Sequence, residues 1–227
     1  MRWHAGKQLR RLQASRSYGF VLVLVLFTFV FVAAAPDEAW PRAVLVLIQA
    51  LTLAVALWTS AATGRLDTIA AALVVIGVMG AVVELATENA NATGLVGLLN
   101  VLLVAVTCAV IVLGIRDQHG VNVQSVLGAL CIYLLIGMFY TFGYGAIAAL
   151  ESGPLFAQGT DGTPSIRLYF SIVSLATVGY GDYTAATDLG RTVAASEGLL
   201  GQIYLVTVVA VIVSRLRPSR SERTNEQ

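Results

Sequence analysis

The sequence is dominated by six apolar runs, each long enough to cross a lipid bilayer. About 20 consecutive apolar residues span the hydrocarbon core as a helix, because a helix satisfies its own backbone hydrogen bonds there. With 57% hydrophobic and only 12% charged residues, the 227-residue chain has too little polar surface for a soluble enzyme. The pattern predicts an all-α membrane protein with six transmembrane helices at 18–35, 43–62, 66–86, 95–115, 122–150 and 188–214.

Basic residues gather on one side of these six runs. They precede the first run, occupy the second and fourth connections and follow the last run, at Arg2, Lys7, Arg10, Arg11, Arg16, Arg65, Arg116, Arg215, Arg217, Arg220 and Arg223. The opposite side holds only Arg42, Arg167 and Arg191. Because positively charged loops stay on the cytoplasmic side, we expect a multi-pass protein of the cell membrane with both termini in the cytoplasm.

The two ends of the chain are polar. Residues 1–17 form a basic segment that we expect at the cytoplasmic surface, either as a helix on the anionic inner leaflet or as a tail. A basic start, an apolar run and the residues Ala33 to Ala35 also resemble a secretory signal, but the long leader and run favour an uncleaved first span. Residues 216–227 form a short charged cytoplasmic tail, so we expect no fused ligand-binding domain.

A polar, glycine-rich stretch interrupts the apolar pattern between the fifth and sixth runs. It reads Ser174-Leu175-Ala176-Thr177-Val178-Gly179-Tyr180-Gly181-Asp182. Glycine enters left-handed backbone conformations without steric cost, so Gly179 and Gly181 allow the alternation that aims successive carbonyls at one axis. Such carbonyls can replace the water shell of an ion. The stretch therefore predicts a re-entrant ion-selectivity filter, with the ion held by the carbonyls of Thr177, Val178, Gly179 and Tyr180.

This stretch resembles the filter of the tetrameric potassium channels, whose Thr-Val-Gly-Tyr-Gly signature it matches at each position from Thr177 to Gly181, with the usual aspartate at Asp182. The resemblance implies a pore domain at 122–215, built from an outer helix at 122–150, a pore helix at 165–176, the filter at 177–182 and an inner helix at 188–214. It further implies a homotetramer in membrane lipid that conducts K+ passively, with no catalytic residues and no cofactor. One chain supplies only a quarter of the carbonyl ring.

Residues just before the filter fit supporting roles in this family. Tyr169 stands thirteen positions before Asp182, where members often have an aromatic donor to the filter aspartate, so we predict a Tyr169–Asp182 hydrogen bond. Ser174, the first residue of the polar stretch that contains the filter, is assigned to filter support. Phe170 and Val173 depart from the family, which often has a tryptophan and, in some bacterial members, a buried carboxylate at these positions.

The last run carries two further candidates. It begins near Asp188, a suitable N-cap, as Ser165 is for the pore helix. Glu197 lies about nine residues into the run, where an ionisable group must face protein or water. We predict that it braces the pore helix and filter from behind, with hydrogen bonds to neighbouring helices as the alternative. Gly201 lies where the family has its hinge glycine, which implies a gating hinge; close packing at Gly198 and Gly201 is the alternative.

The first four runs, 18–116, are expected to form a four-helix transmembrane domain. A voltage sensor needs several arginines at helical spacing, because each charge moved contributes about 2.3 kcal/mol per 100 mV. The fourth run, 95–115, has none, and Arg116 at its inner end is interpreted as an orientation anchor. We therefore expect no arginine-based voltage gating; tension, pH, lipid and a separate regulatory partner remain open as stimuli.

The remaining composition narrows the function further. A net charge of +1 argues against nucleic-acid binding. Cys108 and Cys131 fall inside apolar runs, which favours packing over a disulfide, and His4 and His119 lack the spacing of metal ligands. We expect a channel and not an enzyme. Two alternatives stay open, a subunit of a potassium transporter, although those usually carry four degenerate pore repeats in one chain, and a non-selective cation pore.

Overall fold

The computed structural model describes residues 18–60, 65–86, 90–116 and 123–216. The expected basic segment 1–17 and nearly all of the expected tail 216–227 lie outside the described residues. The described residues form seven helices: α2 (Tyr18–Ala34), α3 (Ala39–Ser60), α4 (Arg65–Ala86), α5 (Ala90–Arg116), α6 (Val123–Leu150), α7 (Pro164–Leu175) and α8 (Asp188–Leu216).

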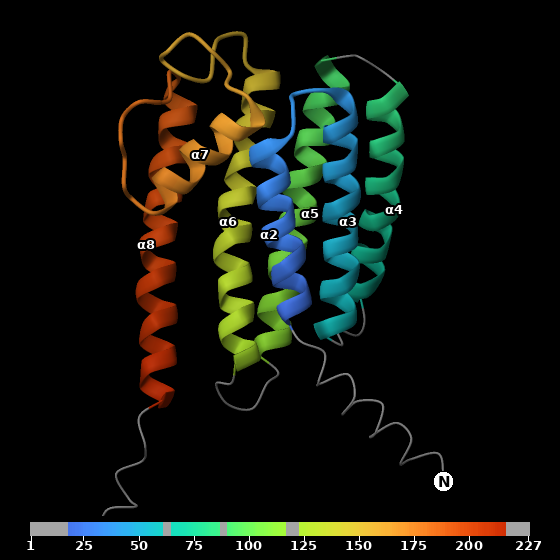
Figure 1. Cartoon of the computed structure of the whole chain (residues 1–227), viewed down its shortest axis with the longest axis vertical. Coiled ribbons are helices and arrows are strands. Elements are labelled where there is room, and N and C mark those ends of the chain that lie inside the picture. Colours follow the sequence, from blue (N-terminus) through green and yellow to red (C-terminus); the bar gives the residue numbers. More distant parts are fainter. Residues whose placement is uncertain (1–17, 61–64, 87–89, 117–122, 217–227) are drawn as a thin grey trace, which may run out of the picture.

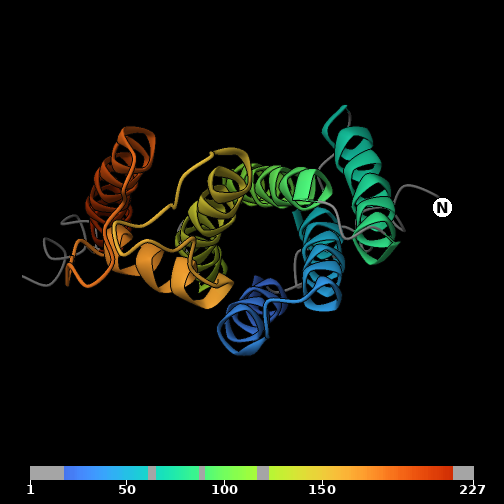
Figure 2. The ribbon, with the colours of Figure 1, turned by 90° about the horizontal axis from the view of Figure 1, so that it is seen from above.

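Six long helices run along one direction, and the short helix α7 lies across them at one end (Figure 1). Seen from above, α4 and α8 occupy opposite edges, with α6 between the group α2–α5 and the pair α7 and α8 (Figure 2). α6 packs against α5, α2 and α7, and α8 packs against α7 and α6. The chain thus has a four-helix side and a side that carries α7 and α8, with α6 joining them.

Three of the described helical segments are long and apolar enough to cross a membrane, judged by length and composition: Ala39–Ser60, Gly94–Arg116 and Val123–Leu150. α2 is also apolar but has only 17 residues. The molecule is therefore an all-α membrane protein, as predicted, whereas its division into six spans stays a prediction. α5 carries one basic residue in its last turn, Arg116.

Large apolar side chains fill the seam between the helices and also cover the outside. Leu53, Leu103 and Leu135 are fully buried between α3, α5 and α6. Phe20 and Val75, on α2 and α4, are 69% and 64% exposed. Apolar surface of this extent is stable in lipid, where side chains have no water to avoid.

Two helix starts differ from the predicted ones. α7 begins at Pro164, because the Oγ1 of Thr163 accepts a hydrogen bond from the N–H of Ile166 at 3.3 Å and caps the helix in place of Ser165. Proline is well suited to the first helical position, since its missing N–H is not needed there. Asp188 is likewise the first residue of α8 and not its N-cap, because the N–H of Gly190 donates to Thr187 Oγ1 at 3.0 Å.

Candidate functional site

The last turn of α7 leads directly into the 177–182 segment. The N–H of Thr177 donates to the carbonyl of Ser174 at 2.9 Å, and the N–H of Val178 donates to the carbonyl of Val173 at 2.9 Å. Carbonyls at a helix C-terminus lack partners within the helix, so the following segment satisfies them. The segment is thereby attached to the negative end of the α7 dipole, which favours a cation nearby.

The backbone of the segment alternates in handedness. Thr177, Gly179 and Gly181 have positive φ angles of 55°, 57° and 78°, and the residues between them do not. Positive φ at the two glycines follows from their lack of a Cβ atom. The positive φ at Thr177 could not be predicted from the sequence, because β-branched residues rarely adopt this conformation. This alternation is the one that sequence reasoning requires for carbonyls aimed at a common axis.

The outer end of the segment is held at Asp182. The hydroxyl of Tyr169 donates to Asp182 Oδ2 at 2.8 Å, so the predicted hydrogen bond is present in the structure. This bond, together with a smaller effect of burial, raises the pKa of the Tyr169 hydroxyl. The side-chain amide of Gln158 donates to the carbonyl of Asp182 at 2.6 Å. The side chain of Asp182 is therefore bound to α7, and its backbone carbonyl is bound to the connection between α6 and α7.

Gln158 belongs to a connection that sequence reasoning did not assign to the site. The N–H of Ala157 donates to the carbonyl of Thr184 at 2.8 Å, and the N–H of Ala186 donates to the carbonyl of Leu155 at 2.8 Å. These bonds dock the connection after α6 against the residues that follow the 177–182 segment. An irregular loop without a motif carries no signal from which such pairing could have been predicted.

Aromatic rings fill the space behind α7. Phe170 packs edge to face against Tyr144 and Phe156, with ring centroids 5.1 Å and 5.2 Å apart. The ring of Tyr180 instead lies parallel to that of Tyr169 at 6.4 Å, with an angle of 2° between the planes. Phe170, which has no donor to offer, thus stabilises the helix by packing, whereas Tyr180 contacts a different ring of its own chain.

Glu197 lies buried at the contact of α6, α7 and α8. Its carboxyl oxygens accept hydrogen bonds from the hydroxyls of Tyr144 on α6 at 2.7 Å and Ser171 on α7 at 2.5 Å. The Ser171 Oγ also lies 2.7 Å from the carbonyl oxygen of Gly137. Glu197 thus contacts the short helix and a neighbouring long helix at once, as the hydrogen-bonding alternative describes, whereas its role in bracing the filter stays a prediction.

Gly201 lies where α8 approaches the end of α7 most closely. A Cβ atom at this position would overlap the carbonyl oxygen of Leu175, and one at Gly198 would lie 3.4 Å from the carbonyl oxygen of Ser174. Gly201 therefore permits a close crossing of α8 over the last turn of α7, which is the packing alternative, whereas a Cβ at Gly198 would make an ordinary van der Waals contact. α8 is continuous through both positions. The gating hinge at Gly201 stays a prediction.

Much of this site is exposed in the single chain. Val178 and Tyr180 are 52% and 71% exposed. On α8, Leu199, Ile203 and Val206 are 62%, 59% and 70% exposed. Apolar and aromatic side chains that project together beside an irregular backbone segment are typical of a surface covered by another molecule.

Comparison with known proteins adds two similarities. Residues 151–217, which include α7, the 177–182 segment and α8, match a family described as ion channel. Over 108 residues the chain is 28% identical to the inward rectifier potassium channel Kirbac3.1 from Paramagnetospirillum magnetotacticum, and this match covers 47% of the chain and 37% of that protein. The chain thus spans little more than a third of the length of that relative. No solved structure matches the chain.

Proposed function

We propose that the chain is one subunit of a homotetrameric potassium channel that conducts K+ passively through residues Thr177 to Gly181. The observation that carries this proposal is the alternating backbone at Thr177, Gly179 and Gly181, found in the one stretch that spells the potassium-channel signature. The ion channel similarity of residues 151–217 and the distant potassium channel relative support it.

The proposed chemistry replaces water by backbone oxygen. A K+ ion loses its hydration shell at the filter and regains oxygen ligands from the carbonyls of Thr177, Val178, Gly179 and Tyr180. Neither a covalent step nor a cofactor takes part. Asp182, Tyr169, Ser174 and Glu197 are assigned to filter support, because each contacts the segment or the helix that leads into it.

Four copies are proposed because one loop cannot surround an ion. The exposed apolar residues of α8 and the exposed Val178 and Tyr180 supply the surfaces that neighbouring copies would cover. Native mass spectrometry of the detergent-purified chain is expected to give a complex of four copies. A stable monomer or dimer that still conducts K+ selectively would contradict the tetramer.

The wider architecture is proposed on the same basis. Six spans place both termini in the cytoplasm of a cell-membrane protein, with a four-helix domain at 18–116 and the pore domain at 122–215. The short tail 216–227 and the basic segment 1–17 then lie at the inner surface. With Arg116 as the one basic residue of α5, the proposed channel does not use an arginine-based voltage sensor.

Potassium flux into liposomes tests the proposal. Purified protein is reconstituted, and K+ uptake is measured with Na+ as competitor for wild type, Gly179→Ala and Gly153→Ala. Alanine at Gly179 must adopt a φ of 57°, which strains a residue with a Cβ. Gly153 has open space around it and an ordinary φ, so the same change there is a matched control.

Selective uptake by wild type and by Gly153→Ala, lost in Gly179→Ala, is the expected result. Uptake that does not distinguish K+ from Na+ would demote the protein to a non-selective pore. Uptake that survives unchanged in Gly179→Ala would show that ions cross elsewhere and would overturn the assignment of residues 177–182.

A further inference from the structure

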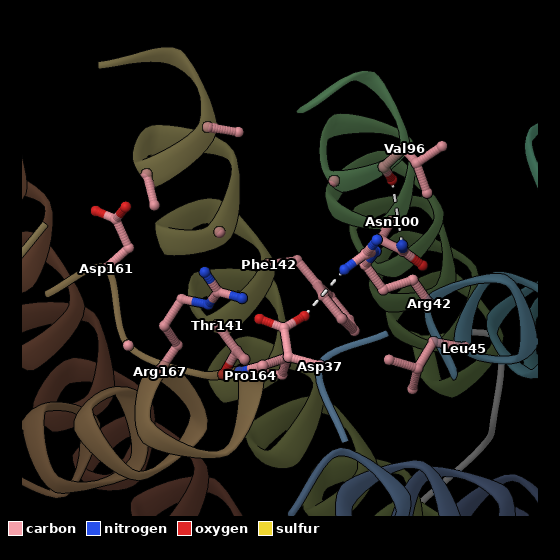
Figure 3. Close-up of a pocket in the computed structure, with 15 residues that line it drawn as sticks. Asp37, Arg42, Leu45, Val96, Asn100, Thr141, Phe142, Asp161, Pro164 and Arg167 are labelled. Carbon is pink, nitrogen blue, oxygen red and sulfur yellow. Dashed lines mark hydrogen bonds and ion pairs between the residues drawn. The ribbon is translucent and has the colours of Figure 1, made fainter. Parts of the chain in front are cut away.

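A cavity of about 270 Å³ lies between the four-helix side and the side that carries α7. Its walls come from α3, α5, α6 and α7, at the end of the molecule where α7 lies (Figure 3). Apolar side chains line part of the wall, among them Leu45, Val96 and Phe142. Charged and amide groups line the rest. The cavity is therefore amphipathic and belongs to neither side of the molecule alone.

Arg167 of α7 supplies a cation to this cavity. Its side chain is half-buried and forms neither a hydrogen bond nor an ion pair with any residue in the described part of the chain. Burial lowers the pKa of the guanidinium, while Asp37 and Asp161 act in the opposite sense. An arginine remains charged under such conditions. The guanidinium thus presents several N–H donors that the protein itself does not use.

The cavity also holds acceptors without a full set of donors. Asn100 is 4% exposed; its amide nitrogen donates to the carbonyl of Val96 at 3.1 Å, whereas its Oδ1 is buried without a partner. Asp161 accepts a hydrogen bond from the N–H of Leu155 through Oδ1 at 2.9 Å, which leaves Oδ2 for another donor. A buried acceptor such as Asn100 Oδ1 normally binds a donor, because an unmade hydrogen bond is costly, whereas Asp161 is exposed.

The charges in the wall balance. Asp37 forms an ion pair with Arg42 at 3.0 Å, and this pair is neutral as a whole even though the Asp37 charge also acts on Arg167. Arg167 and Asp161 remain, one positive and one negative, on the same cavity (Figure 3). A simple anion would meet attraction at the first and repulsion at the second. A group that carries one negative and one positive charge is attracted by both residues.

We propose that this cavity binds a zwitterionic headgroup made of a phosphate and a primary ammonium, of the phosphoethanolamine class. The phosphate lies at Arg167, since a guanidinium pairs with phosphate through two parallel hydrogen bonds. The ammonium lies at Asp161, because its N–H donors suit the carboxylate oxygen that Leu155 does not use, whereas Asn100 lies across the cavity and takes no part in this contact (Figure 3). The apolar wall accommodates the start of an acyl chain, so a phospholipid is the natural source, and free glycerophosphoethanolamine shares the chemistry.

A lipid bound here lies between the two sides of the molecule. Its headgroup contacts Arg167 on α7 and Asp161 in the connection between α6 and α7, and the wall across the cavity comes from α3 and α5 (Figure 3). A bound lipid thus fills the space between the four-helix side and the helix that precedes the 177–182 segment. This proposal concerns binding and does not depend on which ion the molecule conducts.

Native mass spectrometry of the full-length protein in detergent tests the site. Dilauroyl phosphatidylethanolamine, phosphatidylglycerol and phosphatidylcholine are titrated against wild type, Arg167→Gln and Asp161→Asn, with Arg191→Gln as the control. Arg191 is another arginine of the same side but lies outside the cavity, where it donates to the carbonyl of Ala185. Loss of one charge-assisted contact is expected to weaken phosphatidylethanolamine binding about tenfold in Arg167→Gln.

The expected pattern is specific to the headgroup. Wild type and Arg191→Gln prefer phosphatidylethanolamine over phosphatidylcholine, which has no N–H donor, and over phosphatidylglycerol, which has no cation. Asp161→Asn loses the preference over phosphatidylglycerol. Asp161 is exposed and its asparagine variant keeps Oδ1, so this variant tests the site even where Arg167→Gln does not fold.

Other results overturn the proposal. Phosphatidylglycerol bound as tightly as phosphatidylethanolamine by wild type would reject the zwitterion, and equal loss in Arg167→Gln and Arg191→Gln would reject the cavity. Soluble glycerophosphoethanolamine distinguishes a membrane lipid from a free headgroup as the source of the ligand. Competition with the lipid supports the headgroup contacts alone, whereas retained lipid binding without competition supports a lipid held also by its chains.

Discussion

Replacing Glu197 by alanine removes the one carboxyl group that contacts α6 and α7 from within α8. Tyr144 is fully buried, and its hydroxyl loses the acceptor that lies 2.7 Å away. Ser171 keeps the carbonyl of Gly137 at 2.7 Å as an acceptor. The variant thus leaves one buried hydroxyl without a partner, at about 1–3 kcal/mol, and a cavity that adds roughly 1 kcal/mol.

Glutamine at this position is expected to behave differently. Ser171 has one hydroxyl proton but lies within hydrogen-bond distance of two oxygens, Glu197 Oε1 and the Gly137 carbonyl. A proton on the Glu197 side chain allows both contacts to be hydrogen bonds at once. An amide provides such a proton permanently and keeps an oxygen for Tyr144, so Glu197→Gln should lose less than about 1 kcal/mol.

Unfolding in mixed micelles with increasing sodium dodecyl sulfate measures these differences. The expected order of stability is wild type close to Glu197→Gln, both about 2–4 kcal/mol above Glu197→Ala. Tyr144→Phe in the alanine background should recover part of the loss, because it removes the stranded hydroxyl. Equal destabilisation by glutamine and alanine, or no recovery in the double variant, would refute this account of the cluster.

Three further predictions concern α7 and its contacts. Gly201→Ala forces a methyl group against the last carbonyl of α7 and should cost about 1–3 kcal/mol in the same unfolding assay; an unchanged midpoint would contradict the close crossing. Thr163→Ala should lower the free energy of unfolding by about 1 kcal/mol through loss of the N-cap, whereas Ser165→Ala should leave it almost unchanged. The reverse order would show that Ser165 is the N-cap. Tyr169→Phe should make K+ flux decay faster by freeing the outer end of the proposed filter, while Tyr183→Phe, whose hydroxyl forms no hydrogen bond within the described residues, should leave the decay unchanged.

The helices could be predicted because short polar segments separate the apolar runs. Apolar runs of membrane length admit only helices, and their bounds follow from the short polar connections, so α6 was expected at 122–150 and is found at Val123–Leu150. The start of α7 predicted at Ser165 is one residue late, because Thr163 and not Ser165 caps the helix. In such a cap the proline occupies the first helical position.

The hydrogen-bond partners of Glu197 could not be predicted from the sequence. An ionisable residue such as Glu197 in an apolar run requires a polar partner. α6 carries three tyrosines, Tyr133, Tyr140 and Tyr144, on a helix that is apolar on all sides. Without a polar face, no periodicity says which tyrosine meets α8. The same lack of a face hides the cavity at Arg167, which in the sequence is only one external positive charge.

Positive φ at Thr177 connects the local backbone with the proposed assembly. A β-branched residue in this conformation costs of order 1–3 kcal/mol and persists only where its surroundings require it. Within one chain the inner end of the segment is held by the carbonyls of α7, and the outer end by Tyr169 and Gln158. Between these ends, the side chains of Val178 and Tyr180 project from the surface. We therefore infer that neighbouring copies in the proposed tetramer brace the middle of the segment, so that its conformation and the assembly depend on each other.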